Sequence, residues 1–255
     1  MLKKLGRITR AARNGDDENA PPGQFVTEKF PVLTFGSTQS IDLDKWRFRI
    51  FGLVDEEVTL DWKQFMDLEK TTLDAEFHCV TQWSRLQNTW EGVAFTEVMK
   101  LVKPGPEASH VMVHCYGGYT TNMSLDVATD DDVLYAYKHD GAALEADHGG
   151  PLRLVVPKRY GWKSAKWVNG IEFMANNAPG FWEVNGYHME GDPWKEERFS
   201  LEKSASRSLG ARGCLQHQAP APTRSAPAPP DPACAAPPNP ARAAPVLRSC
   251  RGTMA

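Results

Sequence analysis

Cys79 is a lone cysteine at the end of a stretch, Leu73–Cys79, that is typical of a β-strand. Its chemical role needs an explanation. A thiolate is a soft ligand for a transition metal and, when activated, a nucleophile. A lone cysteine at a strand end is more often a small buried side chain. His78 is a poor base for it, because neighbouring strand residues point to opposite faces. On its own, Cys79 therefore leaves three roles open: core thiol, nucleophile or metal ligand.

A second stretch, residues 147–167, concentrates basic groups within an otherwise acidic domain. Arginine is suited to bidentate phosphate contact, and Gly161 allows a backbone to approach a ligand closely. The stretch predicts a site for an anionic, phosphate-bearing ligand; the alternative is a solvated basic face with a turn. Its basic residues are His148, Arg153, Lys158, Arg159, Lys163 and Lys166.

The third stretch, Cys115–Leu125, begins with a Gly-Gly turn that is followed by polar side chains. The polar side chains offer hydrogen-bonding groups; they are Tyr119, Thr120, Thr121 and Asn122. The alternative for the whole loop is an ordinary turn.

The elements that must position these residues alternate between strand and helix patterns without a regular βαβ order, which favours a single α+β domain. We expect helices over 60–70 and 92–102, with Trp62, Phe65, Met66 and Leu68 facing inward in the first. We expect strands over 46–54, 73–79, 109–116, 151–157 and 167–174.

Composition divides the chain into a polar leader (1–24), a folded domain (25–203) and an aromatic-free, Ala/Pro-rich tail (204–255). The tail cannot bury enough apolar surface to fold, so we expect it to be disordered. A basic interaction arm and a shifted reading frame after Lys203 are its alternatives. The domain with its leader holds 23 basic and 31 acidic side chains, which argues against nucleic acid as a partner.

The sequence shows no apolar run long enough to cross a membrane and no secretory or twin-arginine leader, so we expect no membrane partner and a cytoplasmic location with reduced thiols. It lacks GxGxxG after a strand, a phosphate-binding GxxxxGK[ST], GxSxG, HExxH and CxxC. A classical dinucleotide fold and a structural zinc site are therefore not expected.

Four stretches, in their order along the chain, resemble the molybdopterin-binding domain of the sulfite oxidase family. They are FHCVTQWS, the W-x-G-V of Trp90–Val93, GGYTTNMSL and HGGPLRLVVPKRYGWKSAKW. The resemblance covers roughly Pro21 to Ser200 and is closest to the small bacterial sulfite oxidase-like oxidoreductases. It implies a mixed α+β fold around Mo-molybdopterin, the molybdenum cofactor.

The resemblance also implies a role for individual residues. Cys79 would be the protein ligand of the molybdenum. Tyr119 would be the catalytic tyrosine that hydrogen-bonds the substrate oxygen or passes a proton; its alternative is an amphipathic core residue. Cys115 occupies a pterin-contact slot where the family usually has Asp or Thr. The full set of implied cofactor contacts is Leu33, Thr34, Cys79, Cys115, His148, Arg153, Ser164 and Lys166.

The chain departs from true sulfite oxidases after the cysteine, where Val80–Ser84 lack arginines and only Arg85 is basic. We therefore expect a molybdenum oxidoreductase that transfers an oxygen atom to or from a small molecule, the oxo donor or acceptor, of unassigned identity. No haem, flavin or iron–sulfur motif is found, so a separate electron-transfer protein would exchange electrons with it. The alternatives are a non-catalytic pterin-binding or interaction module and, less favoured, a cysteine hydrolase that uses Cys79.

Overall fold

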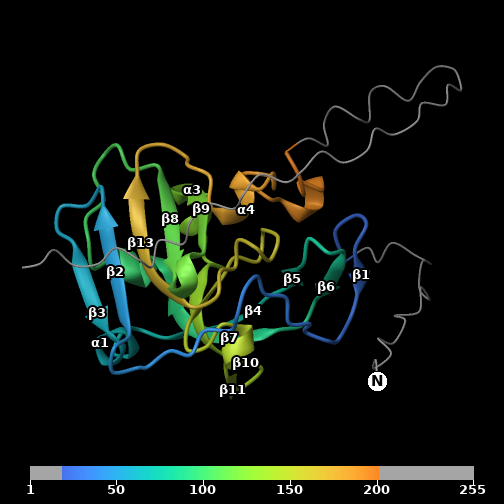
Figure 1. Cartoon of the computed structure of the whole chain (residues 1–255), viewed down its shortest axis with the longest axis horizontal. Helices are drawn as coiled ribbons and strands as arrows, with labels where there is room; N and C mark the ends of the chain where they lie inside the picture. The colour runs from blue at the N-terminus through green and yellow to red at the C-terminus, as the bar shows by residue number, and fades with distance from the viewer. Residues whose placement is uncertain (1–18, 201–255) are drawn as a thin grey trace, which may run out of the picture. The chain divides into compact units, whose positions relative to one another are not determined.

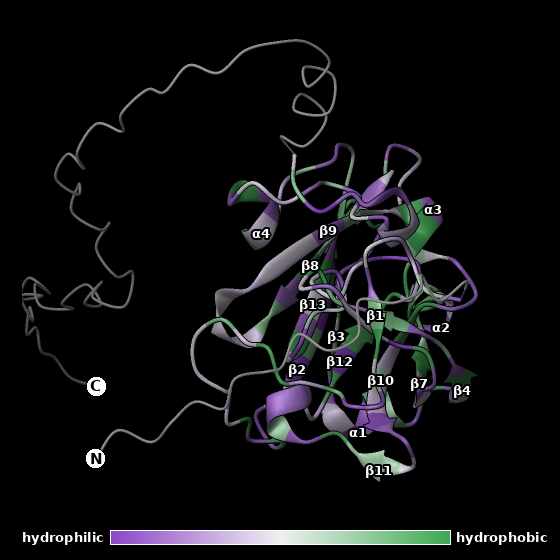
Figure 2. Ribbon diagram, turned by 90° about the vertical axis from the view of Figure 1, so that its right-hand side faces the viewer, coloured by the Kyte–Doolittle hydropathy of each residue, from purple (hydrophilic) through white to green (hydrophobic). Residues whose placement is uncertain are grey.

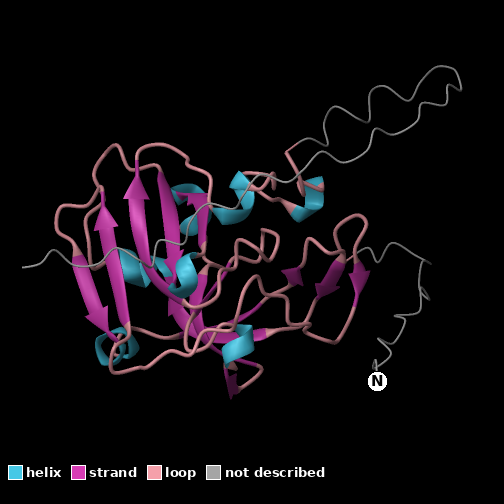
Figure 3. Ribbon diagram, viewed as in Figure 1, coloured by secondary structure: helices cyan, strands magenta, loops and turns pink. Residues whose placement is uncertain are grey.

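The computed structural model describes residues 19–200, which form three β-sheets connected by short helices (Figure 3). This architecture confirms the expected α+β class. The tail (204–255) and residues 1–18 of the leader lie outside the described residues. Within the described part, no helix is long and apolar enough to span a membrane.

The first of the two five-stranded sheets is mixed and has the order β3-β2-β13-β8-β9 (Figure 1). Strands β2 and β13 run parallel, whereas the other neighbours are antiparallel. Its strands are β2 (Arg47–Gly52), β3 (Val58–Asp61), β8 (His110–Cys115), β9 (Thr120–Ser124) and β13 (Val168–Met174).

A second five-stranded sheet runs β11-β10-β7-β4, with β12 also pairing with β10, and a small third sheet has the order β1-β6-β5. The second sheet consists of β4 (Thr71–Asp74), β7 (Thr89–Ala94), β10 (Leu134–His139), β11 (Ala142–Ala143) and β12 (Arg153–Val155). The third consists of β1 (Phe25–Val26), β5 (Phe77–His78) and β6 (Trp83–Arg85).

The helices are all short, and capping explains where the first begins. Asp61 accepts a hydrogen bond from the Gln64 backbone, and the Gln64 side chain accepts one from the Asp61 backbone, which forms a capping box. The helices are α1 (Trp62–Met66), α2 (Phe95–Met99), α3 (Leu125–Ala128) and α4 (Phe181–Val184), with 3₁₀ turns η1 (Tyr116–Gly118), η2 (Ala146–His148) and η3 (Pro193–Lys195).

The core joins the two larger sheets, because alternate residues of their strands contribute to one apolar cluster. In β8, for example, Val111, Val113 and Cys115 all face this cluster, as the two-residue period of a strand requires. Figure 2 shows hydrophobic and hydrophilic residues within the same strands around β8 and β13. Cys79 packs instead in a second, smaller apolar cluster with Phe77, Trp83 and Trp90.

Several expected element boundaries were wrong. The helix expected over 60–70 is preceded by β3 and limited to α1, although Phe65 is fully buried as expected. The expected strand 73–79 is split between β4 and β5, which belong to different sheets. The helix expected over 92–102 begins only at Phe95, because Gly92 and its neighbours pair with β10.

Candidate functional site

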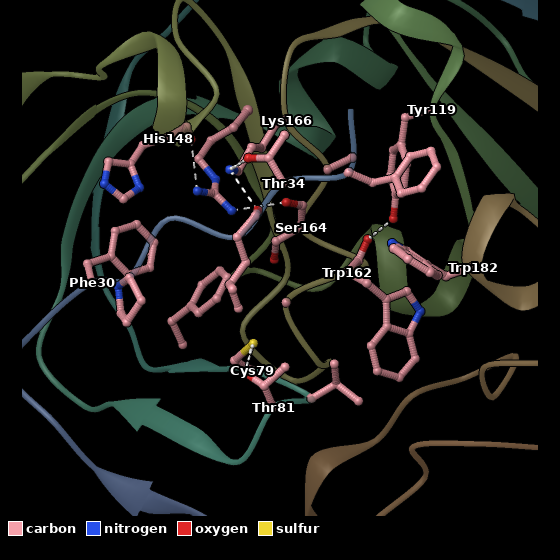
Figure 4. A pocket seen from close by; sticks show the side chains of 18 of the residues that line it. Phe30, Thr34, Cys79, Thr81, Tyr119, His148, Trp162, Ser164, Lys166 and Trp182 are labelled. Atoms are coloured by element: carbon pink, nitrogen blue, oxygen red, sulfur yellow. Dashed lines mark hydrogen bonds between the residues drawn. The ribbon is translucent and has the colours of Figure 1, made fainter. Parts of the chain in front are cut away.

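Eight of the nine predicted site residues line one cavity of about 300 Å³, and Cys115 does not. In Figure 4, Cys79 and Thr81 lie at one end, His148 lies on one side, and Tyr119, Trp162 and Trp182 lie on the opposite side. The eight residues are Leu33, Thr34, Cys79, Tyr119, His148, Arg153, Ser164 and Lys166.

Cys79 begins the tight turn that joins β5 to β6. Its N–H donates to the Trp83 carbonyl at 2.8 Å, and its carbonyl accepts from the Gln82 N–H at 3.1 Å. Gln82 adopts a left-handed φ of 73°, which closes the turn. The Gln24 amide also donates to the Cys79 carbonyl at 3.1 Å, so the end of the leader segment contacts the site. The thiol is therefore fixed by backbone bonds on both sides.

The Cys79 thiol lies 3.1 Å from the Thr81 hydroxyl. Burial raises its pKa, and this effect is opposed by the Thr81 hydrogen bonds and by the charge of Arg198. His78 offers no base, because its ring contacts Ser84 and Glu76 and burial lowers its pKa to about 4. This environment suits a metal ligand, whose proton the metal displaces, better than the nucleophile of a cysteine hydrolase.

Arg153, at the start of β12, places its guanidinium among aromatic rings. It lies 5.3 Å from the centre of the Phe77 ring and 5.4 Å from that of Trp90. It donates to the carbonyls of His148 at 2.9 Å and Ser164 at 3.0 Å. The side chain is 2% exposed, so these contacts hold a buried cation at the cavity wall.

Lys166 lies beside Arg153 and connects three separate segments. Its ammonium donates to the Thr34 hydroxyl at 2.7 Å, the Leu33 carbonyl at 2.9 Å and the Asp147 carbonyl at 2.6 Å. The predicted residues Leu33 and Thr34 are thereby brought to the same wall as the basic stretch.

His148 and Ser164 complete this wall, which we call the cationic wall (His148, Arg153, Ser164 and Lys166). The His148 ring stacks on Phe30 at 4.7 Å, and its pKa is lowered by burial and then by the two neighbouring cations. The Ser164 hydroxyl accepts from the Val156 N–H at 3.0 Å. Ser164 thus fixes the turn whose backbone approaches the cavity.

Neither cation of this wall forms an ion pair with a carboxylate of residues 19–200, and the opposing charge that acts on Lys166 is that of Asp147. Burial lowers the pKa of Arg153 to about 9 and that of Lys166 to about 8, so both remain protonated at neutral pH. A buried charge without a counterion is costly, and an anion bound in the cavity would remove that cost. The residues present therefore fit a phosphate-bearing cofactor, whose metal the Cys79 thiolate could ligate.

The opposite side, which we call the aromatic wall, consists of Tyr119, Trp162, Trp182 and Tyr187. Tyr119 donates to the Trp162 carbonyl at 2.5 Å, and Tyr187 stacks on Trp182 with ring centres 4.8 Å apart. Burial, and then the charge of Glu183, raise the pKa of Tyr119 well above its usual range. Tyr119 is thus a neutral hydrogen-bond donor rather than a base.

A buried ion pair stands behind the aromatic wall. The Lys163 ammonium lies 2.6 Å from a Glu183 carboxylate oxygen, and these side chains are 1% and 0% exposed. The same oxygen accepts from the Trp162 indole N–H at 2.8 Å. The pair therefore anchors Trp162 without adding net charge to the wall.

The structure does not bring Cys115 to the cavity. Its side chain follows Val111 and Val113 onto the core face of β8, and burial raises the pKa of its thiol strongly. Only its backbone approaches the site, by donating to the Tyr119 carbonyl at 3.0 Å. The geometry gives no support to a pterin contact by its thiol.

Three of the six basic residues in the stretch 147–167 also do not line the cavity. Lys163 pairs with Glu183, Lys158 pairs with Asp130, and the Arg159 guanidinium donates to the Lys158 carbonyl. Arg85, the one cation expected just after Cys79, forms an ion pair with Asp140 at 2.6 Å and does not line the cavity.

Sequence reasoning missed Trp182, Tyr187 and the Glu183 behind them, which belong to the segment Phe181–Tyr187. An aromatic-rich stretch, F-W-E-V-N-G-Y, was the available signal. It carries no motif and lies about 100 residues from Cys79 in the chain. Arg198 could not be identified from the sequence either; it donates to the Val80 carbonyl at 2.7 Å, beside Cys79.

Comparison with known proteins agrees with this geometry. The family model described as oxidoreductase molybdopterin binding domain matches residues 35–182. The uncharacterized oxidoreductase YuiH of Bacillus subtilis (strain 168) is 44% identical over 199 residues, which cover 78% of this chain and 99% of YuiH. The protein-methionine-sulfoxide reductase catalytic subunit MsrP of Gluconobacter oxydans is 28% identical over 193 residues, which cover 66% of this chain and 60% of MsrP.

Among solved structures, the sulfane dehydrogenase SoxCD from Paracoccus pantotrophus has a similar fold. The TM-score is 0.51 at 21% sequence identity, and the match covers 55% of this chain and 40% of that one. At this identity the similarity concerns the fold of the domain alone.

Proposed function

This chain belongs to the family of oxidoreductases with a molybdopterin-binding domain, and from that premise we propose that it transfers an oxygen atom to or from a small substrate. The molybdenum cofactor supplies the two-electron redox chemistry when it is bound. We propose that the substrate is a small oxo donor or acceptor, and we assign a role to each residue that lines the cavity.

One observation carries the proposal: the Cys79 thiol opens into the same cavity as the buried Arg153 and the half-buried Lys166, neither of which forms an ion pair with a carboxylate of residues 19–200. A soft ligand and an anion site in one cavity match the two ends of a metal-bearing, phosphate-bearing cofactor. Cys79 would ligate the metal, while Arg153 and Lys166 would neutralise the phosphate.

The remaining residues would orient the cofactor and the substrate. The neutral His148 ring and the Ser164 turn offer hydrogen-bonding groups to the pterin. Tyr119, which stays protonated, would donate a hydrogen bond to the substrate oxygen, in exchange for its bond to the Trp162 carbonyl.

We further propose that a separate electron-transfer protein exchanges electrons with this domain. The name of the MsrP relative, a catalytic subunit, supports such an arrangement by analogy. The cytoplasmic location stays a prediction, which fractionation of cells that express the full chain would test.

Metal and pterin analysis of the full chain, purified from a cofactor-competent host, tests the proposal. We expect about one molybdenum per chain, lost in Cys79→Ser because the hydroxyl is a much weaker ligand than a thiolate. Cys115→Ser is the matched control, and it should retain the metal because that thiol does not line the cavity. Wild-type protein without molybdenum would refute the proposal.

The same preparation separates the enzyme from a non-catalytic pterin-binding module. Turnover of sulfite, a sulfoxide or an N-oxide with an artificial electron donor or acceptor supports oxygen transfer. Bound pterin and metal without turnover of any of these would favour the module.

A further inference from the structure

The aromatic wall carries no charged side chain toward the cavity. Trp162 packs edge-on against Tyr187 at 5.0 Å, and Tyr187 stacks on Trp182, so the rings form a continuous apolar surface. Figure 4 shows Trp162 and Trp182 on the side of the cavity opposite His148, and Val80 and Thr81 of the Cys79 turn also line the cavity.

Of the three cations near this surface, two pair with carboxylates and the third does not line the cavity. The Lys163 charge is neutralised by Glu183, and the Arg85 charge is neutralised by Asp140. The Arg198 guanidinium, whose charge acts on the Cys79 thiol, lies behind Val80: it stacks over the Tyr160 ring, donates to the Val80 carbonyl and does not line the cavity. An anionic substrate on the aromatic wall would therefore have no cation in direct contact with it, which is unfavourable.

The aromatic wall is also fixed before any ligand arrives. Trp162 is held through its indole N–H by Glu183 and through its carbonyl by the Tyr119 hydroxyl. A preformed apolar surface favours flat, apolar groups, because little ordering entropy is lost when they bind.

We propose that the substrate is an uncharged organic oxide with a flat, apolar group that packs on Trp162, Trp182 and Tyr187, rather than an oxyanion such as sulfite or nitrate. This inference rests on the proposed function, in which the cofactor phosphate occupies the cationic wall. For a sulfoxide, the S–O bond breaks, the sulfur is reduced by two electrons, and the oxygen leaves with two protons as water. The electrons come from a reduced electron-transfer protein.

A matched pair of substrates tests the charge preference on the molybdenum-loaded full chain, with reduced methyl viologen as donor. Methyl phenyl sulfoxide should have a kcat/KM at least about tenfold above that of para-(methylsulfinyl)benzoate, which adds only a carboxylate. Sulfite oxidation with ferricyanide and nitrate reduction with viologen should both be weaker than sulfoxide reduction. A preference for the benzoate or for either oxyanion would overturn the proposal.

A tryptophan variant tests the surface itself. Trp182→Ala should raise KM for methyl phenyl sulfoxide about tenfold and KM for dimethyl sulfoxide less than about twofold, because only the former stacks on the ring. Calorimetric binding of methyl phenyl sulfide should weaken in parallel, a readout independent of turnover. Trp194→Ala, at an exposed tryptophan outside the cavity, is the control.

These outcomes are separable from the proposed function. Equal effects of Trp182→Ala on both sulfoxides, with molybdenum and pterin still bound, would refute the substrate class alone. Absence of molybdenum and pterin from the wild-type protein would refute the proposed function first.

Discussion

Both walls of the cavity include or contact buried charged side chains, but only those behind the aromatic wall form an ion pair within the protein. Lys163 has Glu183 at 2.6 Å, whereas Arg153 and Lys166 donate only to neutral oxygens within residues 19–200. Since an unpaired buried charge is costly, the cationic wall is incomplete without a ligand anion. The buried pair of the aromatic wall is already neutral, which is why we propose that an uncharged group packs on this wall.

The largest expected effect comes from removing the counterion behind the aromatic wall. Glu183→Gln leaves the Lys163 ammonium buried without an anion, and we expect a loss of about 3–5 kcal/mol in the free energy of unfolding. Urea denaturation of the cofactor-free protein would measure it. Adding Lys163→Met to the same chain should recover much of the loss, because the unpaired charge is then removed.

The exposed pair of Arg49 and Glu57 provides the control for this prediction. Both side chains are about half exposed, so Glu57→Gln should change the free energy of unfolding by less than about 1 kcal/mol. Equal losses in Glu57→Gln and Glu183→Gln would contradict the contrast between a buried and a solvated pair.

On the cationic wall the corresponding change should affect cofactor binding instead. Arg153→Met removes a buried donor to the phosphate or pterin, and we expect about 100-fold weaker cofactor retention. Pterin fluorescence after oxidative release, together with metal analysis, would quantify it. Lys158→Met, at a surface lysine paired with Asp130, should retain the cofactor fully. Retention by both variants would show that the cationic wall does not bind the cofactor.

The two walls also differ in how far the sequence could predict them. The residues of the cationic wall lie within one motif-bearing stretch, so Arg153, Ser164 and Lys166 could be assigned before the fold was known. The partners of Lys163 and Arg85 could not be assigned, because Glu183 and Asp140 come from distant segments and the pairing depends on the tertiary fold. The same cause explains the strand-to-helix boundary at Phe95, which pairing of β7 with β10 decides.

Lys166 gives the cationic wall a pH signature that the aromatic wall lacks. Burial lowers its pKa to about 8 in the cofactor-free protein, below the value of about 10.4 in an unfolded chain. The unfolded state then binds more protons between these values, so cofactor-free stability should rise from about pH 8 upward. An anion binds the protonated form, so cofactor affinity should fall over the same range, by at most about tenfold per pH unit.

Denaturation and pterin release, each measured from pH 7 to 10, would show these opposite trends. In Lys166→Met, the free energy of unfolding and the cofactor affinity should both depend less on pH between 7 and 10. Parallel trends in the wild-type protein would mean that no anion-binding cation titrates in this window.

The smallest expected effect is at the hydrogen bond that joins Tyr119 to Trp162. Tyr119→Phe leaves the Trp162 carbonyl without its donor and should cost about 1 kcal/mol of stability, because Glu183 still holds the indole. Since the pKa of Tyr119 lies well above its usual range, this loss should be the same from pH 6 to 9. A loss that varied with pH in this window would mean that Tyr119 titrates there, and that the aromatic wall carries a charge after all.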